Sequence, residues 1–273
     1  MPHTGFDATG DVTTPRTYPD TRLVERRAGI LSLLRAEGSR QVTELAQELG
    51  VSKETIRRDL RILEDEGVII RKHGRALAAE ASSFETTMTQ RQNTLLPEKR
   101  RIAAAAAEEI RTAETIFIDE GYTPSVVAKL VSTDRNRVFV TASLPTAAAL
   151  MNIPQFTVYL AGGRVRGSTM GCVDHWTTAM LEKFRFDVAI IGANGISISN
   201  GLTTPDPSVA IVKETAIRSA QRTVFVGVYT KFGITSFAQF GTLKDLDLIV
   251  TDTHMPAHRA THFAVNGPKV LRV

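Results

Sequence analysis

Residues 45–60 read LAQELGVSKETIRRDL, and this stretch decides the fold of the N-terminal part of the chain. It predicts a short helix over residues 43–49, a tight turn at Gly50, and a second helix that Ser52 caps at its N-terminus. An amphipathic helix predicted over residues 22–37 precedes both. Helices joined by such a short turn form the layout of a helix-turn-helix.

The helix that follows Ser52 has an apolar face and a cationic face. Ile56, Leu60 and Leu63 recur at helical spacing and are predicted to face the core. Another stripe is basic, and hydroxyl groups stand at the N-terminal end, where a recognition helix enters the major groove. The residues predicted to contact DNA from this helix are Ser52, Lys53, Thr55, Arg57, Arg58 and Arg61.

A basic hairpin is predicted after this helix. Apolar residues 68–70 and 76–78 flank a turn through Gly74, so they form a two-stranded wing. Cations at its tip, which are Arg71, Lys72, His73 and Arg75, would neutralise backbone phosphates beside the groove. On a single charged helix, the basic side chains could simply face water and bind no partner. The helix, turn, capped basic helix and wing together favour a DNA reader.

Composition and charge limit the other possibilities. The 273 residues are 42% hydrophobic and 23% charged with a net charge of +4, which is typical of a globular protein. The single cysteine, Cys172, excludes an intramolecular disulfide and gives no sign of an oxidising compartment. No stretch approaches the roughly 18–20 apolar residues of a membrane span, and the first twenty residues lack the apolar core of a secretory signal. We therefore expect a soluble cytoplasmic protein with no membrane partner.

The pattern of apolar and charged residues divides the chain into four parts. We predict a disordered tail at residues 1–20, a winged helix-turn-helix at 21–78, a linker at 79–97 and a second domain at 98–273. In the second domain, strands are predicted at 115–119, 137–141, 156–161, 187–191, 223–228, 246–251 and 269–273. Helices are predicted between them at 98–111, 125–131, 145–151, 174–183 and 208–221.

Several of these strands are apolar throughout, as residues 188–191 and 248–250 illustrate. Continuous apolar strands are typical of a parallel sheet that helices cover on both faces. The alternation of strands and helices therefore predicts a doubly wound α/β domain.

Polar residues and glycines follow the predicted strands, where an open α/β sheet binds its ligands. Glycines expose peptide N–H groups, and hydroxyl groups with cations complete an anion cradle. Each residue taken singly could belong to a turn or cap a helix, but together they predict a ligand with phosphate and hydroxyl groups. They are Asp119, Gly121, Thr123, Thr141, Ser143, Gly162, Gly163, Arg166, Gly192, Asn194, Lys231 and Asp252.

Other chemistries find little support in the sequence. The glycines near Gly162 and Gly192 do not match a nucleotide fingerprint, so we expect no nucleotide cofactor. His254, His258 and His262 recur every four residues, but no suitably spaced third ligand accompanies them, so we expect no metal site.

The stretch from Thr55 to Leu60, TIRRDL, with Gly67 and the wing RKHG at residues 71–74, resembles the DeoR/GlpR-type bacterial repressors of sugar catabolism. The likeness extends from about Arg22 to the C-terminus. It implies a homo-oligomer, a dimer or tetramer, that binds a double-stranded DNA operator. It also implies a C-terminal sensor similar to ribose-5-phosphate isomerase, with a phosphorylated sugar as effector and Lys213 among the effector-binding residues.

Two positions depart from the pattern of that family. Ala142 stands where asparagine is usual, and Val228 stands where an aspartate is usual. Loss of the aspartate removes a hydroxyl contact and, in an enzyme, a candidate acid–base group. We expect a repressor of a carbohydrate catabolism operon and not an enzyme. The alternatives are an activator of the same type and an isomerase with an accessory DNA-binding domain.

Overall fold

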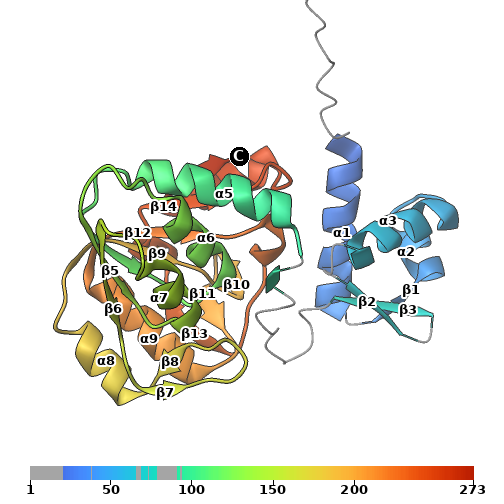
Figure 1. The fold of residues 1–273 in the computed structure, drawn as a ribbon. Helices are drawn as coiled ribbons and strands as arrows, with labels where there is room; N and C mark the ends of the chain where they lie inside the picture. Colours follow the sequence, from blue (N-terminus) through green and yellow to red (C-terminus); the bar gives the residue numbers. More distant parts are fainter. Residues whose placement is uncertain (1–20, 38, 66–68, 73, 79–90, 93) are drawn as a thin grey trace, which may run out of the picture.

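The computed structural model describes residues 21–273 except 38, 66–68, 73, 79–90 and 93 (Figure 1). The predicted tail and most of the predicted linker lie outside the described residues. We call residues 21–78 the N-terminal region and residues 91–273 the C-terminal region. No described helix is both long and apolar enough to cross a membrane.

The N-terminal region combines three helices with a small antiparallel sheet in which β3 pairs with β1 and β2. Its elements are α1 (Thr21–Glu37), β1 (Arg40–Gln41), α2 (Val42–Glu48), α3 (Lys53–Asp65), β2 (Ile69–Lys72) and β3 (Arg75–Ala78). The three helices and the wing β2–β3 confirm the predicted winged helix-turn-helix. Strand β1 was not predicted, because two polar residues carry no strand pattern.

The start and the packing of α3 follow from its sequence. The Ser52 hydroxyl accepts a hydrogen bond from the Thr55 backbone N–H at 3.1 Å, which caps the helix. Ile56, Leu60 and Leu63 are fully buried, as predicted. Each contributes about 1.5–3 kcal/mol by leaving water, so α3 is held to the core by one face.

A buried carboxylate ties α3 to α1. Asp59 is 1% exposed, and its oxygens accept hydrogen bonds from Arg26 Nε at 2.5 Å and Arg27 Nε at 3.1 Å. Both arginine side chains keep partial access to water, with 21% and 16% exposure. Asp59 therefore has a structural role within the TIRRDL signature.

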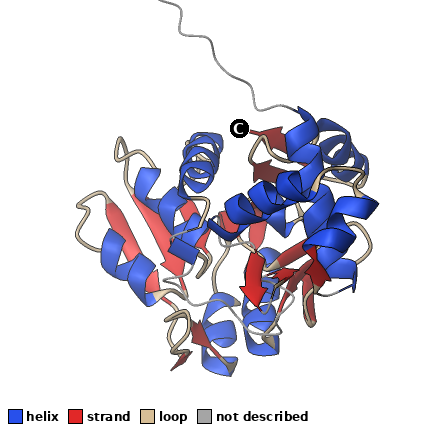
Figure 2. Cartoon of the chain, turned by 90° about the vertical axis from the view of Figure 1, so that its right-hand side faces the viewer, coloured by secondary structure: helices blue, strands red, loops and turns tan. Residues whose placement is uncertain are grey.

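The C-terminal region contains the larger sheet and most of the core. Its elements are α5 (Leu96–Glu109), β4 (Thr115–Ile118), α6 (Tyr122–Leu130), β5 (Arg137–Thr141), α7 (Leu144–Leu150), β6 (Phe156–Leu160), β7 (Arg164–Val165), β8 (Cys172–Val173), α8 (His175–Leu181), β9 (Phe186–Ile191), β10 (Gly195–Ser197), β11 (Gly201–Thr204), α9 (Pro207–Arg218), β12 (Ala220–Val226), the short helix η2 (Tyr229–Lys231), β13 (Ala238–Gly241), η3 (Leu243–Asp245), β14 (Leu248–Thr251), α10 (Ala257–Val265) and β15 (Lys269–Arg272). Figure 2 distinguishes the helices from the strands.

The seven strands of the central sheet are parallel and lie in the order β15-β14-β12-β9-β4-β5-β6. All seven were predicted, and the order confirms a doubly wound α/β domain. The chain runs outward from β4 to β6 and then returns to place β9 on the other side of β4. Because crossovers are right-handed, this reversal puts α6 and α7 on one face of the sheet and α9 on the other. The carboxyl ends of β4 and β9 form the switch point.

Two smaller sheets were not predicted. Strands β7 and β8 form a hairpin, and β10, β11 and β13 form an antiparallel sheet. One boundary was also wrong, since the helix predicted to residue 221 ends at Arg218 and Ala220 begins β12 by pairing with Phe186. The pairing of Ala220 with β9 decides the conformation after Arg218, although the apolar residues before it recur at helical spacing.

The Asp59 contacts generate a stability prediction. Replacing Asp59 with Asn removes the charge that two arginines share, and we expect the N-terminal region to lose about 1–3 kcal/mol of unfolding free energy. Urea unfolding of the full chain followed by circular dichroism measures the change. The control is Glu64→Gln, which breaks an exposed pair with Arg71 at 3.6 Å and should cost about 0–1 kcal/mol. Equal losses in the two variants would contradict the structural role of Asp59.

Candidate functional site

The residues predicted to contact DNA from α3 form an accessible face. Ser52, Lys53, Arg57, Arg58 and Arg61 are exposed, and Thr55 is half-buried beside the cap. The Arg57 guanidinium lies 3.4 Å from the Glu54 carboxylate, and both side chains are more than half exposed. Such a pair is weak in water, so Arg57 can exchange Glu54 for a phosphate or a base edge at small cost.

The basic residues of the wing have different surroundings. Arg71 is exposed and pairs with Glu64, whereas Arg75 is half-buried and donates to the Ser39 hydroxyl at 2.9 Å and the Ser39 carbonyl at 2.6 Å. Arg75 therefore links β3 to the residues before α2. Lys72 ends β2, and His73 lies outside the described residues.

A pocket of about 540 Å³, including its open mouth, lies at the carboxyl ends of β4, β9 and β12. This is the switch point of the central sheet, where doubly wound domains bind ligands. Four cationic side chains and one carboxylate are among the residues that line it. The lining residues are Arg91, Lys99, Asp119, Gly121, Tyr122, Thr123, Pro124, Gly192, Ala193, Asn194, Lys213, Val226, Gly227, Val228 and Lys231.

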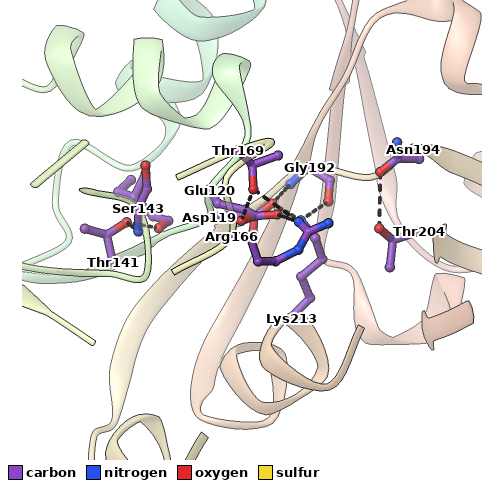
Figure 3. Close-up of polar contacts among 11 residues, drawn as sticks. Asp119, Glu120, Thr141, Ser143, Arg166, Thr169, Gly192, Asn194, Thr204 and Lys213 are labelled. Atoms are coloured by element: carbon purple, nitrogen blue, oxygen red, sulfur yellow. Dashed lines mark hydrogen bonds and ion pairs between the residues drawn. The ribbon is translucent and has the colours of Figure 1, made fainter. Parts of the chain in front are cut away.

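A buried ion pair forms the floor of this pocket (Figure 3). Lys213 Nζ, from α9, contacts Asp119 Oδ2 at the end of β4, and both side chains are at most 5% exposed. Lys213 Nζ also donates to the Gly192 carbonyl at 3.1 Å, and the Gly192 N–H donates to Asp119 Oδ2 at 2.9 Å. These bonds join β4, β9 and α9 at one point and fix a charged group under the pocket.

Seven of the thirteen residues predicted to bind an effector line the pocket. They are Asp119, Gly121, Thr123, Gly192, Asn194, Lys213 and Lys231. Arg91, Lys99 and Tyr122 also line it but were not predicted. Arg91 and Lys99 precede the first strand of the sheet, so reading the residues after each strand could not find them.

The other predicted residues support the loops around the pocket. The Thr141 hydroxyl donates to the Ile118 carbonyl at 2.7 Å, and the Ser143 hydroxyl accepts from the Thr146 N–H at the start of α7. The Gly162 carbonyl accepts from the Thr177 hydroxyl at 2.6 Å.

Close packing and turn geometry explain two further predicted positions. A Cβ on Gly163 would lie 2.3 Å from Thr177 Oγ1, and the φ of Gly163 is +137°, so only glycine fits. Asp252 is fully buried and accepts from the Tyr229 N–H at 2.7 Å. That bond holds the turn η2, which ends at the pocket residue Lys231.

Arg166 lies in a second buried network next to Asp119 (Figure 3). Its guanidinium is 3.5 Å from Glu120 Oε1 and 3.1 Å from Asp206 Oδ2, and Asp206 caps α9, which carries Lys213. The Thr169 hydroxyl donates to Glu120 Oε2 at 2.9 Å. Glu120 was not singled out from the sequence, although it directly follows Asp119. The network connects the floor of the pocket to the β7–β8 hairpin.

Burial raises the pKa of Glu120 above its usual value, since desolvation outweighs the opposing attraction of Lys213 and Arg166. The folded protein therefore keeps this proton to a higher pH than the unfolded chain does.

The two positions that depart from the family pattern lie in different places. Val228 is buried and lines the pocket with Lys231, so an apolar side chain stands at the position where the resemblance implies an aspartate. Ala142 is buried outside the pocket lining, and its carbonyl accepts from the Cys172 N–H at 2.7 Å.

The histidines do not gather around a common point. His254 Nδ1 lies 2.9 Å from Asp252 Oδ1, while His258 and His262 lie on α10. Among the residues that the structure describes, no group of three or more histidine, cysteine or acidic side chains is placed to hold a metal ion.

The raised pKa of Glu120 predicts a pH dependence of stability. A raised carboxyl pKa stabilises the fold at low pH, and this contribution is lost as pH rises from the ordinary value of 4.5 through the raised pKa. Glu120→Gln should therefore gain stability relative to the wild type as pH rises from about 4.5 to about 7. Urea unfolding at several pH values measures this, with the exposed Glu182→Gln as control. A difference that does not change with pH would contradict it.

Comparison with protein families matches both regions of the chain. Residues 95–253 match the DeoR C-terminal sensor domain, and residues 26–82 match the DeoR-like helix-turn-helix domain. The first match alone spans more than half of the chain and includes the pocket residues that follow the strands.

Full-length relatives agree with this result. The chain is 37% identical to the HTH-type transcriptional regulator GlpR of Haloferax volcanii over 90% of its own length and 96% of that protein. It is 34% identical to the glycerol-3-phosphate regulon repressor of Escherichia coli K12, over 85% of this chain and 92% of the relative. A ribose 5-phosphate isomerase A from Methanocaldococcus jannaschii aligns with a TM-score of 0.36 at 13% identity, over 49% and 53% of the two chains. From the two family matches and the two regulators, we conclude that this protein belongs to the DeoR family of transcriptional regulators.

Proposed function

We propose that this protein represses an operon of carbohydrate catabolism and that a small phosphorylated metabolite, bound in the pocket at the switch point, changes its affinity for the operator. The observation that carries the proposal is the cationic pocket at the sheet edge, in a chain whose α3 also presents an exposed basic face. The first feature suits an anionic ligand and the second suits DNA.

The proposed DNA contact is made by α3 and the wing. Ser52, Lys53 and Thr55 lie at the N-terminal end of α3, the part of a recognition helix that approaches base edges. Arg57, Arg58 and Arg61 extend the basic face along the same helix, and Arg71 and Lys72 add cations on the wing. We assign His73 to the same interface, and Arg75 to holding the wing in place. Two copies of the chain would read two half-sites, which requires a dimer or tetramer.

The chemistry of the pocket defines the proposed ligand class. Lys231 supplies positive charge that the Lys213–Asp119 pair does not compensate, and the pocket lining includes Tyr122 and Thr123 at the start of α6, which Gly121 precedes as cap. Asp119 and Asn194 are suited to hydroxyl groups, since carboxylate and amide oxygens accept hydrogen bonds. A ligand that carries one anionic group and several hydroxyl groups and fits a pocket of this size is a phosphorylated polyol or sugar. The names of two relatives refer to glycerol 3-phosphate, which makes it the first ligand to test.

The remaining predicted residues are assigned an indirect role. Thr141, Ser143, Gly162, Gly163, Arg166 and Asp252 shape the loops that carry the direct contacts. An isomerase is disfavoured, because Val228 places an apolar side chain where catalysis of proton transfer would need a carboxylate. We propose a cytoplasmic regulator without catalytic activity.

A double change on α3 tests the DNA contact. Arg57→Ala with Arg58→Ala should weaken binding to a fragment of the promoter of its own gene at least about 30-fold, because it removes two cationic side chains that each contribute about 1–3 kcal/mol. Fluorescence anisotropy at several salt concentrations measures the affinity. The slope of log K against log salt should also become shallower by about one for each phosphate that the variant no longer neutralises.

The matched control for this change lies on α9. Arg218 pairs with Glu214 at 3.1 Å on an exposed helix face, much as Arg57 pairs with Glu54. Arg218→Ala should leave operator affinity within about twofold, because it removes an exposed surface charge on α9, outside the proposed DNA contact of α3 and the wing. If the double variant kept wild-type affinity, the assignment of α3 as recognition helix would be wrong.

A substitution in the pocket tests the ligand site. Lys231→Gln removes a half-buried cation from the pocket lining and should weaken glycerol 3-phosphate binding at least about tenfold, since a charge-assisted hydrogen bond contributes about 1.5–3 kcal/mol. Isothermal titration calorimetry of the full chain measures this. Lys244→Gln, a change in η3 outside the pocket lining, is the control. Unchanged affinity in Lys231→Gln would remove Lys231 from the site.

A further inference from the structure

Strand β6 forms one edge of the central sheet and carries none of the residues that usually protect an edge. It pairs with β5 on one side, and no strand that the structure describes pairs with its other side (Figure 1). Its five residues, FTVYL at 156–160, include no charged residue and no proline. Edge strands usually carry such residues, because free peptide groups can pair with another strand. The opposite edge strand, β15, does so with Lys269 and Arg272.

The bonds between β5 and β6 show which peptide groups of β6 point away from the sheet. The Arg137 N–H donates to the Gln155 carbonyl at 2.9 Å, so Gln155 directs its carbonyl towards β5. Successive residues of a strand direct their peptide groups to opposite sides. Phe156, Val158 and Leu160 therefore direct theirs to the outer edge.

Antiparallel pairing of β6 with β6 of a second copy, centred on Val158, would use these groups. The two Val158 residues exchange a pair of hydrogen bonds, and each Leu160 N–H donates to the Phe156 carbonyl of the other copy. The Phe156 N–H needs no partner in this arrangement, because it donates to the Ile153 carbonyl of its own chain at 3.0 Å. The outer edge of β6 is therefore complementary to itself about a two-fold axis.

Exposed aromatic side chains lie beside this edge on the face that α8 covers. Tyr159 is 44% exposed, and its ring centre lies 5.6 Å from that of Phe184, which follows α8. The Thr177 hydroxyl bonds to the Gly162 carbonyl, so the start of α8 lies against the residues that follow β6. Trp176 precedes Thr177 and is 67% exposed.

The face that α7 covers has apolar side chains as well. Leu160 is 36% exposed, and Met151 at the end of α7 is 65% exposed. A two-fold axis perpendicular to the sheet places each face beside the same face of the second copy. Apolar groups then meet apolar groups on both faces, and their removal from water favours association.

We propose that two copies of this chain associate through β6, antiparallel and centred on Val158, so that their two seven-stranded sheets become one continuous sheet. The choice of a second copy as partner rests on the proposed function, which needs two copies to read two half-sites. An isologous contact of this kind closes on itself and leaves neither β6 edge open to further copies.

Sedimentation of the full chain tests the interface. The wild type should form an even-numbered oligomer. Val158→Pro removes both N–H groups at the axis and should weaken the association of the two copies at least about tenfold. The fold should persist, because a proline is tolerated on an edge strand where the N–H does not face the neighbouring strand.

The matched control is a valine on the other edge of the sheet. Val270 on β15 is half-buried, as Val158 is. The Lys269 N–H donates to the Asp247 carbonyl at 3.0 Å, so the next residue, Val270, directs its N–H away from β14. Val270→Pro should leave the association within about twofold of the wild type. A monomeric wild type, or equal association in the two proline variants, would overturn the proposal.

Cross-linking tests the register and does not depend on a proline variant. Paired residues at the axis have Cα atoms about 5.5 Å apart, which a disulfide can span. With Cys172 replaced by alanine, oxidation of Val158→Cys should therefore give a covalent dimer. Leu160→Cys should give none, because its two copies lie about 13 Å apart along the strands. Cross-linking of Leu160→Cys alone would rule out pairing centred on Val158.

The failures of the two proposals are distinguishable. If the wild type binds its operator while Val158→Cys does not cross-link and Val158→Pro associates as the wild type does, the proposed function stands and the β6 interface is overturned. If Val158→Cys cross-links but the wild type binds neither operator nor glycerol 3-phosphate, the interface stands and the proposed function fails.

Discussion

A lysine on α9 reaches the carboxylate at the end of β4, and both groups are almost completely removed from water. Breaking a buried pair by removing one partner costs about 3–5 kcal/mol, because the remaining charge is left without compensation. The Gly192 peptide bonds to both partners, so the ends of β4 and β9 and one face of α9 have a single arrangement. The floor of the pocket is therefore rigid before any ligand enters.

The surroundings of this pair determine what the pocket can do. Glu120 directs its carboxylate away from the floor to Arg166 and Thr169, and Arg166 continues to Asp206 at the cap of α9. On the other side, Lys99 brings the residues that lead in from the N-terminal region to the mouth. The pocket therefore lies against the sheet edge and the residues that precede α5. The bonds of Glu120 link its floor to the β7–β8 hairpin.

Much of the architecture could be predicted from local patterns. The seven parallel strands are continuous apolar runs, and the face of α3 that holds Ile56, Leu60 and Leu63 follows from helical spacing. The hairpin β7–β8 and the sheet β10-β11-β13 escaped prediction because their strands have two to four residues. In such short strands, pairing partners far along the chain decide the conformation.

The sequence by itself determined the family, through TIRRDL and the wing, and the set of polar residues at the strand ends. Only the tertiary structure decided which of those residues face a pocket. Thr141 and Asp252 use their polar atoms within the fold and lie outside the pocket lining, whereas Lys231 lines the cavity. It also brought Arg91 and Lys99 to the site from a segment without any motif. The physical reason is that a charged pocket is built from side chains close in space, and chain folding brings them together regardless of their separation in sequence.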